Sequence, residues 1–357
     1  MIVQKHTIST SPIQGTFPGT QQDLLFFDIE TTGFSPSDTA LYMIGAVFFD
    51  RSVWMATQWL CESRDEEDSV LSAFLAFSQN FSVLIHFNGE GFDLPYLEKK
   101  AEKYGLHTPF RSMTSIDIYR KIRPFRKLLN LSHMNQKSLE LFLDIQRSDR
   151  LSGKELISVY QIYEQTHPDE CEKLLLLHNL DDLRGMLALT SLLAYPALFG
   201  EHRFSLENMA WMDTPDGQPD LALELSLETP VPKPVSLRQE RCYLIADGSV
   251  CRLLVHAFEG ELKYFLPDYQ NYYYLPREDQ AVHKSVGSAL PSEFRMQATA
   301  HSCYLRKYGL FLPQKAELFH PLFQKDYKDP QLWFECTEQF MDSPSDLLLY
   351  IKSLISI

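Results

Sequence analysis

The sequence has no long apolar run, few cysteines and less basic than acidic charge, and each of these features excludes a class of protein. No stretch of its 357 residues approaches the roughly 20 apolar residues that a membrane-spanning helix requires. The opening stretch, MIVQKHTISTSPIQG, has no apolar signal core, so we expect no export. The six cysteines form no C-x-x-C pair, which argues against a zinc site or a disulfide framework and favours reduced thiols in the cytoplasm.

The charge balance argues against a protein that grips nucleic acid by bulk attraction. The 33 lysines and arginines are outnumbered by 47 aspartates and glutamates, which gives a formal net charge of −14. An enzyme that meets phosphates through metal ions remains compatible, because carboxylates reserved for metals also count as acidic. The length predicts two domains, which we place at residues 1–200 and 201–357.

Predicted strands and helices alternate in the first of these domains. The pattern predicts strands at 23–30, 41–50, 52–61, 82–87 and 111–119. It predicts helices at 63–77, 92–105 and over most of 120–198. Strands separated by helices indicate an α/β layer fold. Residues 213–235, with several prolines, are predicted to be a linker, and the short β-like runs that follow indicate a smaller, β-rich C-terminal domain.

Two carboxylates share one face of the first predicted strand. Asp28 and Glu30, in DLLFFDIE, are two residues apart and therefore project side by side. Two carboxylates about 4 Å apart repel each other by roughly 4 kcal/mol at an effective dielectric constant of about 20. A fold tolerates such a pair where a cation lies between the two groups or where water reaches them. The pair therefore marks either a metal site or a solvated strand end.

Two later segments add side chains of the same kind. Asp93 follows the predicted strand 82–87 and lies near the start of a helix, where α/β folds place sites and where a carboxylate also serves as a cap. His178 and Asp182, in LLLLHNLDDL, are four apart and share a helix face, and the leucines predict burial on more than one side. A buried carboxylate requires a partner or a metal, whereas an exposed His–Asp pair would be ordinary surface.

Together, the three segments resemble the motifs of the DEDD exonuclease superfamily, which has the ribonuclease H-like fold. FDIETTGF resembles the first motif, HFNGEGFDLP the second and HNLDDL the third. Within that superfamily the chain is most similar to the YprB-like ribonuclease H-like domain proteins of bacteria, which DIYRKIR, KSLELFLDIQRSD and SGKELISVYQIY also fit. The resemblance covers about residues 22–195 and implies a mixed sheet flanked by helices.

The third motif departs from both subclasses of the superfamily. One subclass has a tyrosine four residues before the last aspartate, and the other has a histidine five residues before it. His178 lies four residues before Asp182 and so combines the spacing of one with the side chain of the other. Asp181 is a competing ligand, although we favour Asp182. This departure leaves the role of His178 as general base open.

The resemblance implies a 3′–5′ exonuclease that hydrolyses phosphodiester bonds of DNA or RNA with two divalent cations, Mg²⁺ or Mn²⁺. The metal ligands would be the carboxylates of Asp28, Glu30, Asp93 and Asp182, with Asp28 bridging both ions. His178 would accept or orient the proton of a water molecule. Thr31, Asn88 and Phe92 would line the pocket of the terminal nucleotide, although Phe92 is equally suited to the core beneath its helix.

Two stretches outside the motifs combine aromatic residues with nearby positive charge. YRKIRPFRK (119–127) suits either a phosphate track with stacking faces or a solvated helix face. YQNYYYLP (269–276) suits either base stacking or the aromatic core of a β-rich domain.

The expected partner is a single-stranded DNA or RNA end, and no membrane. The alternative hypothesis is a nucleic-acid-binding or scaffold protein that keeps the ribonuclease H-like fold with a degenerate site, which the unusual third motif favours. A third hypothesis gives the C-terminal domain a partner-binding role, with the nuclease as its effector.

Overall fold

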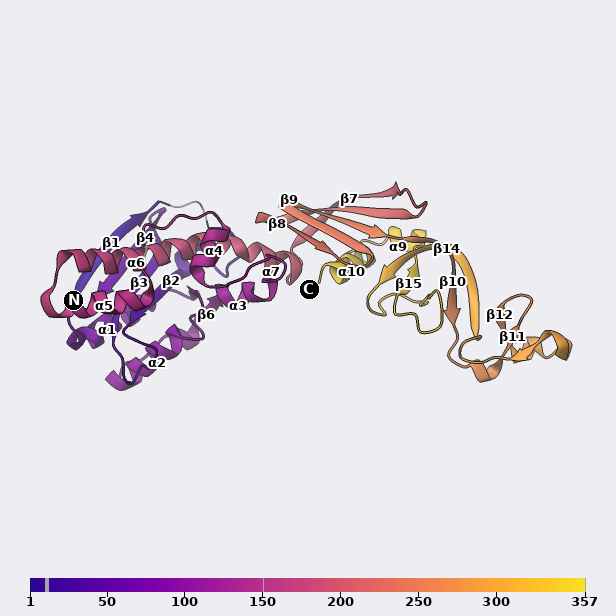
Figure 1. Ribbon diagram of the computed structural model, residues 1–357, viewed down its shortest axis with the longest axis horizontal. Coiled ribbons are helices and arrows are strands. Elements are labelled where there is room, and N and C mark those ends of the chain that lie inside the picture. The colour runs from indigo at the N-terminus through magenta and orange to yellow at the C-terminus, as the bar shows by residue number, and fades with distance from the viewer. Residues whose placement is uncertain (10–12, 150, 357) are drawn as a thin grey trace. The chain divides into compact units, whose positions relative to one another are not determined.

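The polypeptide divides into two units in the computed structural model, which describes residues 1–9, 13–149 and 151–356 (Figure 1). The first unit comprises Met1–Ala197 together with Thr229–Lys233. The second comprises Leu198–Glu228 and Pro234–Ile357. Among the described residues, no helix combines the length and apolar character needed to cross a bilayer.

A mixed sheet of six strands forms the centre of the first unit. Its strands are β1 (Ile2–Ile8), β2 (Leu24–Thr31), β3 (Leu41–Asp50), β4 (Val53–Leu60), β5 (Val83–His86) and β6 (Thr114–Asp117). They lie in the order β1-β4-β3-β2-β5-β6. β5 runs parallel to both β2 and β6, whereas the other neighbours are antiparallel. The predicted α/β class with a mixed sheet is confirmed.

Helices cover both faces of this sheet, which explains the continuous apolar run at the start of β2. Phe27 packs against Phe74 of helix α1 (Glu67–Ser78), with ring centroids 5.5 Å apart. The next residue, Asp28, accepts a hydrogen bond from Asn179 of helix α6 (Asp169–Leu189). Because adjacent strand residues point to opposite faces, α1 and α6 lie on opposite sides of β2.

The remaining helices of this unit follow the predicted pattern. They are α2 (Asp93–Tyr104), α3 (Ile118–Ile122), α4 (Gln136–Phe142), α5 (Gly153–Thr166) and α7 (Ala194–Phe199). Short 3₁₀ turns are η1 (Gln21–Asp23), η2 (Arg64–Glu66), η3 (Phe110–Ser112), η4 (Arg123–Phe125) and η5 (Thr190–Leu193). Gly105 ends α2 in the left-handed conformation, and Ser152 begins α5 with a capping box that includes Glu155.

One prediction for the first unit is wrong in part, and one strand was not predicted. The predicted strand 111–119 is reduced to β6, because its last residues start helix α3, where the Asp117 side chain accepts a hydrogen bond from the Arg120 backbone. The sequence analysis also missed β1, an edge strand that pairs with β4 and alternates only weakly in polarity. Residues 10–12 of the opening stretch lie outside the described residues.

The second unit is β-rich, as predicted, and contains three small sheets. One sheet contains β7 (Phe204–Asp213), β8 (Pro219–Arg238) and β9 (Cys242–His256). A second contains β10 (Phe258–Phe265), β14 (Tyr304–Gln314) and β15 (Leu332–Glu335). A third contains β11 (Tyr272–Leu275), β12 (Gln280–His283) and β13 (Met296–Gln297). Its helices are α8 (Lys284–Gly287), α9 (Glu338–Met341) and α10 (Pro344–Ile355), with 3₁₀ turns η6 (Tyr269–Asn271) and η7 (Ser292–Phe294).

The prediction of a linker at 213–235 is wrong, because most of this segment belongs to strand β8. Its leucines from Leu221 to Leu227 alternate with more exposed residues and are buried on one face. Pro230, Pro232 and Pro234 are two residues apart, so their missing N–H groups face a single edge of the strand. They lie beyond Leu227, where the pairing with β7 ends. Prolines are therefore tolerated here, and the sequence analysis gave them too much weight.

The close packing of α6 on β3 can be tested at Gly45. A Cβ at this position would lie 1.9 Å from Asn179 Oδ1 and 2.8 Å from Leu183 Cδ1. We expect Gly45→Ala to lower the free energy of unfolding by about 1–3 kcal/mol, measured by urea denaturation, because the helix must move away from the sheet. Gly153→Ala is the control, since no heavy atom lies within 4 Å of its Cβ. Equal stability of the two variants would contradict this packing.

Candidate metal centre

The first two carboxylates of the site project from β2 toward α6. Asp28 pairs with Gly45 across the sheet, and its Oδ2 accepts a hydrogen bond of 3.2 Å from Asn179 Nδ2. Glu30 lies two residues further on the same face, where the Tyr42 hydroxyl donates to its Oε2 over 3.4 Å. The spacing of these residues in a strand is therefore what directs both carboxylates to one helix.

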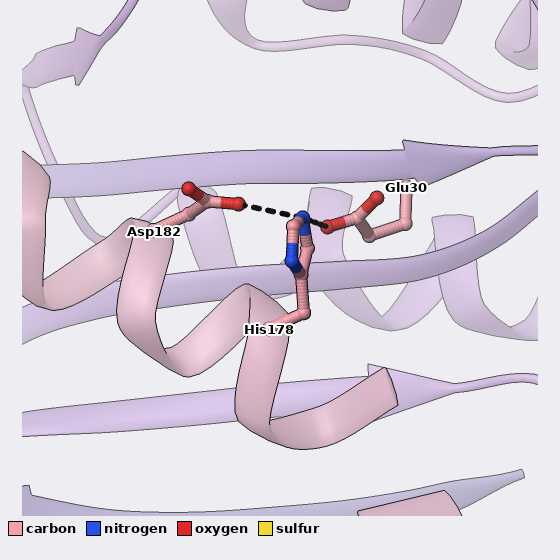
Figure 2. A group of neighbouring side chains, drawn as sticks. All are labelled: Glu30, His178 and Asp182. Carbon is pink, nitrogen blue, oxygen red and sulfur yellow. Dashed lines mark ion pairs between the residues drawn. The ribbon is translucent and has the colours of Figure 1, made fainter. Parts of the chain in front are cut away.

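The side chains that α6 contributes lie one turn apart (Figure 2). His178 Nε2 lies 3.1 Å from Asp182 Oδ2 and 3.7 Å from Glu30 Oε1. One donor atom from each of these three residues lies within 4.8 Å of the other two. Figure 2 shows the imidazole between the carboxylates, with Glu30 reaching it from the strand. Segments about 150 residues apart in the chain thus meet in one place.

Asp93 joins this group from the first turn of α2. It is buried, with 7% of the residue exposed, and the backbone of Ile29 hydrogen-bonds to its carboxylate. Its negative charge raises the pKa of both Asp28 and Glu30, so the three carboxylates are close enough to repel one another. The position of Asp93 follows from the topology, because the carboxyl ends of the parallel strands β2 and β5 lie at one edge of the sheet.

Burial and mutual repulsion shift the protonation of these groups. Burial raises the pKa of Asp28 well above its usual range, and the charges of Asp182, Glu30 and Asp93 raise it further. Burial also raises the pKa of Glu30 to about 7, against the opposing attraction of His178. For Asp93, burial likewise raises the pKa to about 7. The pocket therefore favours added positive charge.

In His178 and Asp182 the charged form is favoured instead, because the two side chains form an ion pair. Burial alone would lower the pKa of His178, but the neighbouring carboxylates of Asp182 and Glu30 raise it to about 9. Burial alone would raise the pKa of Asp182, but His178 and Arg147 hold it below its usual value.

Arg147, Asp149 and Glu140 belong to the site but were missed in the sequence. Asp149 Oδ2 lies 2.6 Å from His178 Nδ1. Arg147 Nη1 lies 2.8 Å from Asp182 Oδ1 and 2.9 Å from Glu140 Oε2. Both Arg147 and Asp149 come from the connection between α4 and α5, within a segment that the family resemblance already included. No periodicity marks them, so only the resemblance drew attention to this stretch.

The two aspartates that competed for the third motif have different surroundings. Asp182 points at His178 and Arg147 within the pocket. Asp181 Oδ2 instead accepts hydrogen bonds from the backbone N–H groups of Ser148 (2.7 Å) and Asp149 (2.9 Å). Asp181 therefore fixes the connection that carries Arg147 and Asp149.

The residues expected at a nucleotide pocket are next to Glu30 and Asp93 in the chain, at the end of β2 and before α2. The Thr31 hydroxyl donates to the Gly33 carbonyl over 2.9 Å. Asn88 has φ of 63°, and its backbone N–H donates to Asp117 over 2.9 Å. The half-buried Phe92 ring packs edge-to-face against Phe34, which is 89% exposed and was not singled out in the sequence.

The two mixed basic and aromatic stretches offer fewer stacking faces than expected. In 119–127 all five basic side chains are exposed, but Phe125 is buried and Tyr119 packs against Phe87. In 269–276 the ring of Tyr273 is covered by Arg295 and Lys284, at 4.6 and 5.4 Å from its centroid. Base stacking, one of the two alternatives for each stretch, is therefore disfavoured at Phe125 and Tyr273, whose rings are covered within the protein.

The donor set fits a divalent cation. Two ligands about 2.1 Å from one ion and at right angles to each other lie about 3 Å apart. The Nε2–Oδ2 distance of 3.1 Å and the Nε2–Oε1 distance of 3.7 Å are compatible with such an arrangement. Asp28 and Asp93 add oxygen donors that pair with no lysine or arginine among the described residues. The residues present thus suit hard divalent ions.

Residues 25–194 match the sequence model of the RNase_H superfamily. No curated protein sequence matches the chain. The family B DNA polymerase of the hyperthermophilic archaeon Pyrobaculum calidifontis is similar over 54% of this chain and 29% of its own, with 18% identity and a TM-score of 0.41.

Two structures of E. coli exonuclease I are also similar to this chain, each with 12% sequence identity. The zinc-bound complex with single-stranded DNA matches 63% of this chain and 54% of its own, with a TM-score of 0.32. The complex with a dT13 oligonucleotide matches 63% of this chain and 55% of its own, with a TM-score of 0.34. The chain thus spans about half the length of exonuclease I or less than a third of the polymerase.

The repulsion within the pocket predicts a pH dependence of stability. In the folded protein the pKa of Glu30 is about 7, against a usual value of 4.5. A pKa raised by folding contributes stability that is lost as the pH rises through the folded-state value. Asp28, Asp93 and His178 have raised values too. The contribution of Glu30 and Asp93 is lost as the pH rises from their usual pKa values to about 7, and that of His178 as it rises from 6.5 to about 9. We therefore expect the melting temperature in EDTA to fall between about pH 5 and 9, and Mn²⁺ to restore it at the higher pH.

A matched pair of variants separates this effect from general alkaline sensitivity. Asp28→Asn should raise the melting temperature of the metal-free protein at the higher pH, because it removes one of the repelling charges. Glu98→Gln, at an exposed position of α2, should leave the pH dependence unchanged. A wild-type protein whose stability in EDTA stays constant or rises over this range would contradict the prediction.

Proposed function

We propose that the chain is a metal-dependent nuclease of the DEDD exonuclease type, which hydrolyses phosphodiester bonds from the 3′ end of single-stranded DNA or RNA. The proposal is supported by the mutual repulsion of the buried carboxylates of Asp28, Glu30, Asp93 and Asp182, which raises the pKa of Asp28 and Glu30, and by the contact of His178 with Glu30 and Asp182. These residues come from β2, from the start of α2 and from α6. The RNase_H-type domain over residues 25–194 supports the same proposal.

The cost of this arrangement indicates that it serves a ligand. Removing charged groups from water is expensive unless each is paired, and four carboxylates in one pocket also repel each other. His178 and Arg147 balance Asp182, but Asp28 and Asp93 pair with no lysine or arginine among the described residues. A site built for divalent cations accounts for this surplus of negative charge better than a purely structural cluster does.

In this proposal the carboxylates of Asp28, Glu30, Asp93 and Asp182 would hold two divalent cations, Mg²⁺ or Mn²⁺, and Asp28 would contribute to both sites. When bound, such ions lower the pKa of a coordinated water and neutralise charge at the leaving oxygen. The chain itself supplies orientation: Asn179 holds Asp28, the Ile29 backbone holds Asp93, and Arg147 holds Asp182. His178 belongs to the catalytic group, because its Nε2 faces the same carboxylates.

The terminal nucleotide would lie at the edge of the pocket formed by the turn between β5 and α2. Thr31 and Asn88 provide polar groups there, and Phe92 with the exposed Phe34 provides an aromatic surface for a base. Base stacking on such rings is worth about 1–3 kcal/mol per base and is tolerant of sequence. The five exposed basic residues of 119–127 are proposed to contact the phosphate backbone.

Degradation of oligonucleotides labelled at either end tests the proposal directly. We expect Mn²⁺-dependent release of mononucleotides from the 3′ end, inhibition by EDTA and a loss of at least about 100-fold for Asp28→Ala, because a shared metal ligand is removed. Matched DNA and RNA strands identify the substrate, and Glu98→Gln serves as the control. Binding of the strands without any cleavage would instead support the alternative, a degenerate binding or scaffold protein.

The competing aspartates of the third motif are distinguished by comparing two isosteric variants. We expect Asp182→Asn to reduce cleavage at least about 100-fold, because it removes a ligand, and also to lower stability, because His178 and Arg147 lose a charged partner. Asp181→Asn should lower stability by about 1–3 kcal/mol, because two backbone N–H groups lose a charged acceptor. Activity is compared at a temperature where both variants are folded. A larger activity loss for Asp181→Asn would transfer the ligand role to Asp181.

A further inference from the structure

Both ring nitrogens of His178 face carboxylates, and this arrangement constrains what the imidazole can do. Nδ1 lies 2.6 Å from Asp149 Oδ2. Nε2 lies 3.1 Å from Asp182 and 3.7 Å from Glu30 (Figure 2). The side chain is 8% exposed. The imidazole is therefore part of the interior of the site.

Asp149 is itself held in place and so fixes the orientation of the ring. Its Oδ1 accepts the backbone N–H of Leu151 over 2.9 Å, and Lys137 Nζ lies 3.2 Å from its Oδ2. Its side chain is 3% exposed. Because an ionised carboxylate only accepts hydrogen bonds, Nδ1 carries the hydrogen in this pair. The lone pair of Nε2 in the neutral ring is then directed at Glu30 and Asp182.

This is the arrangement in which histidines bind metals in proteins. A metal-bound histidine usually donates its other ring N–H to a carboxylate or carbonyl, which fixes the ring and strengthens the ligand. Two residues four apart on a helix, such as His178 and Asp182, also have a spacing that allows both to bind one ion. A proton acceptor requires a water beside its nitrogen, whereas here two carboxylate oxygens face Nε2.

We propose that His178 is a nitrogen ligand, through Nε2, of the cation held by Glu30 and Asp182, and that Asp149 is the positioning residue that orients it. The inference rests on the proposed function, in that these carboxylates bind divalent cations, and it replaces the proton-acceptor role implied by the motif. A nitrogen ligand reduces the advantage of Mg²⁺, which prefers an all-oxygen environment, and favours Mn²⁺ and later first-row ions.

Pulsed electron paramagnetic resonance of bound Mn²⁺ tests the ligand assignment without any enzymatic reaction. The full chain is treated with EDTA, freed of chelator and loaded with less than one equivalent of Mn²⁺. We expect modulation from a directly coordinated nitrogen in the wild type, its loss in His178→Gln and its retention in His133→Gln, an exposed control. Wild-type protein that binds Mn²⁺ without nitrogen modulation overturns the assignment, whether or not the variants fold.

Calorimetric titration of Asp149→Asn tests the positioning role. We expect the affinity for Mn²⁺ to fall about ten-fold or more, as for other partners of metal-bound histidines, while the affinity for Mg²⁺ changes less. The nitrogen modulation should also weaken or change in frequency. Equal losses for the two metals, with an unchanged spectrum, would show that Asp149 has only a structural role.

These measurements separate the ligand assignment from the proposed nuclease function. Nitrogen coordination in a protein that cleaves no nucleic acid would overturn the nuclease proposal and support the assignment. Metal-dependent cleavage without nitrogen coordination would support the nuclease proposal and overturn the assignment. A protein that binds no divalent cation overturns both.

Discussion

The packing of α6 against the centre of the sheet is the constraint on which the site depends. Asn179, which is fully buried, links three elements: its Oδ1 accepts a hydrogen bond from Gln58 of β4, and its Nδ2 donates to Asp28 of β2. This contact is possible because Gly45 has no side chain, since a Cβ at this position would collide with Asn179. The polar link therefore sets the distance between β2 and α6, and with it the distance between the carboxylates of the strand and those of the helix.

Positive charge within the protein is distributed unevenly over the site. It lowers the pKa of Asp149 and Asp182, whereas burial still raises the pKa of Glu140 beside Arg147. Arg147, Lys137 and His178 cluster around Asp149, Asp182 and Glu140, where each carboxylate has at least one cationic partner. Among the side chains that the structure describes, the neutral amide of Asn179 donates to Asp28, whose pKa is raised, whereas the pKa of Asp182 is lowered. The need for added positive charge is thus greatest on the β2 side of the pocket. His178 stands at the boundary, because its Nε2 faces Glu30 of the strand as well as Asp182 of the helix.

The parts of this arrangement that can be predicted from the sequence are those that follow from strand alternation or helical spacing. Alternation in β2 places Asp28 and Glu30 together, and helical spacing does the same for His178 and Asp182. That these pairs meet was inferred only from the family resemblance, because pairing of distant segments leaves no local pattern. Arg147 and Asp149 were missed for the same reason: they lie in an irregular connection whose path is set by Asp181, an acceptor for its backbone. Strand β8 was misread because its prolines lie beyond the stretch paired with β7, which the sequence alone does not show.

The five residues from His178 to Asp182 contact the carboxylates of the site, the sheet and the connection before α5 from little more than one turn of helix. His178 and Asp182 face the carboxylates of the pocket, Asn179 faces the sheet, and Asp181 faces the connection before α5. Four of the five side chains are polar, yet this turn lies in a helix whose other buried positions are mainly apolar. Well-packed apolar residues often match or exceed buried ion pairs in stability, so stability alone would not favour this composition. Its polar content is explained if the turn exists to hold a charged ligand, with Asn179 and Asp181 fixing the register in which His178 and Asp182 reach it.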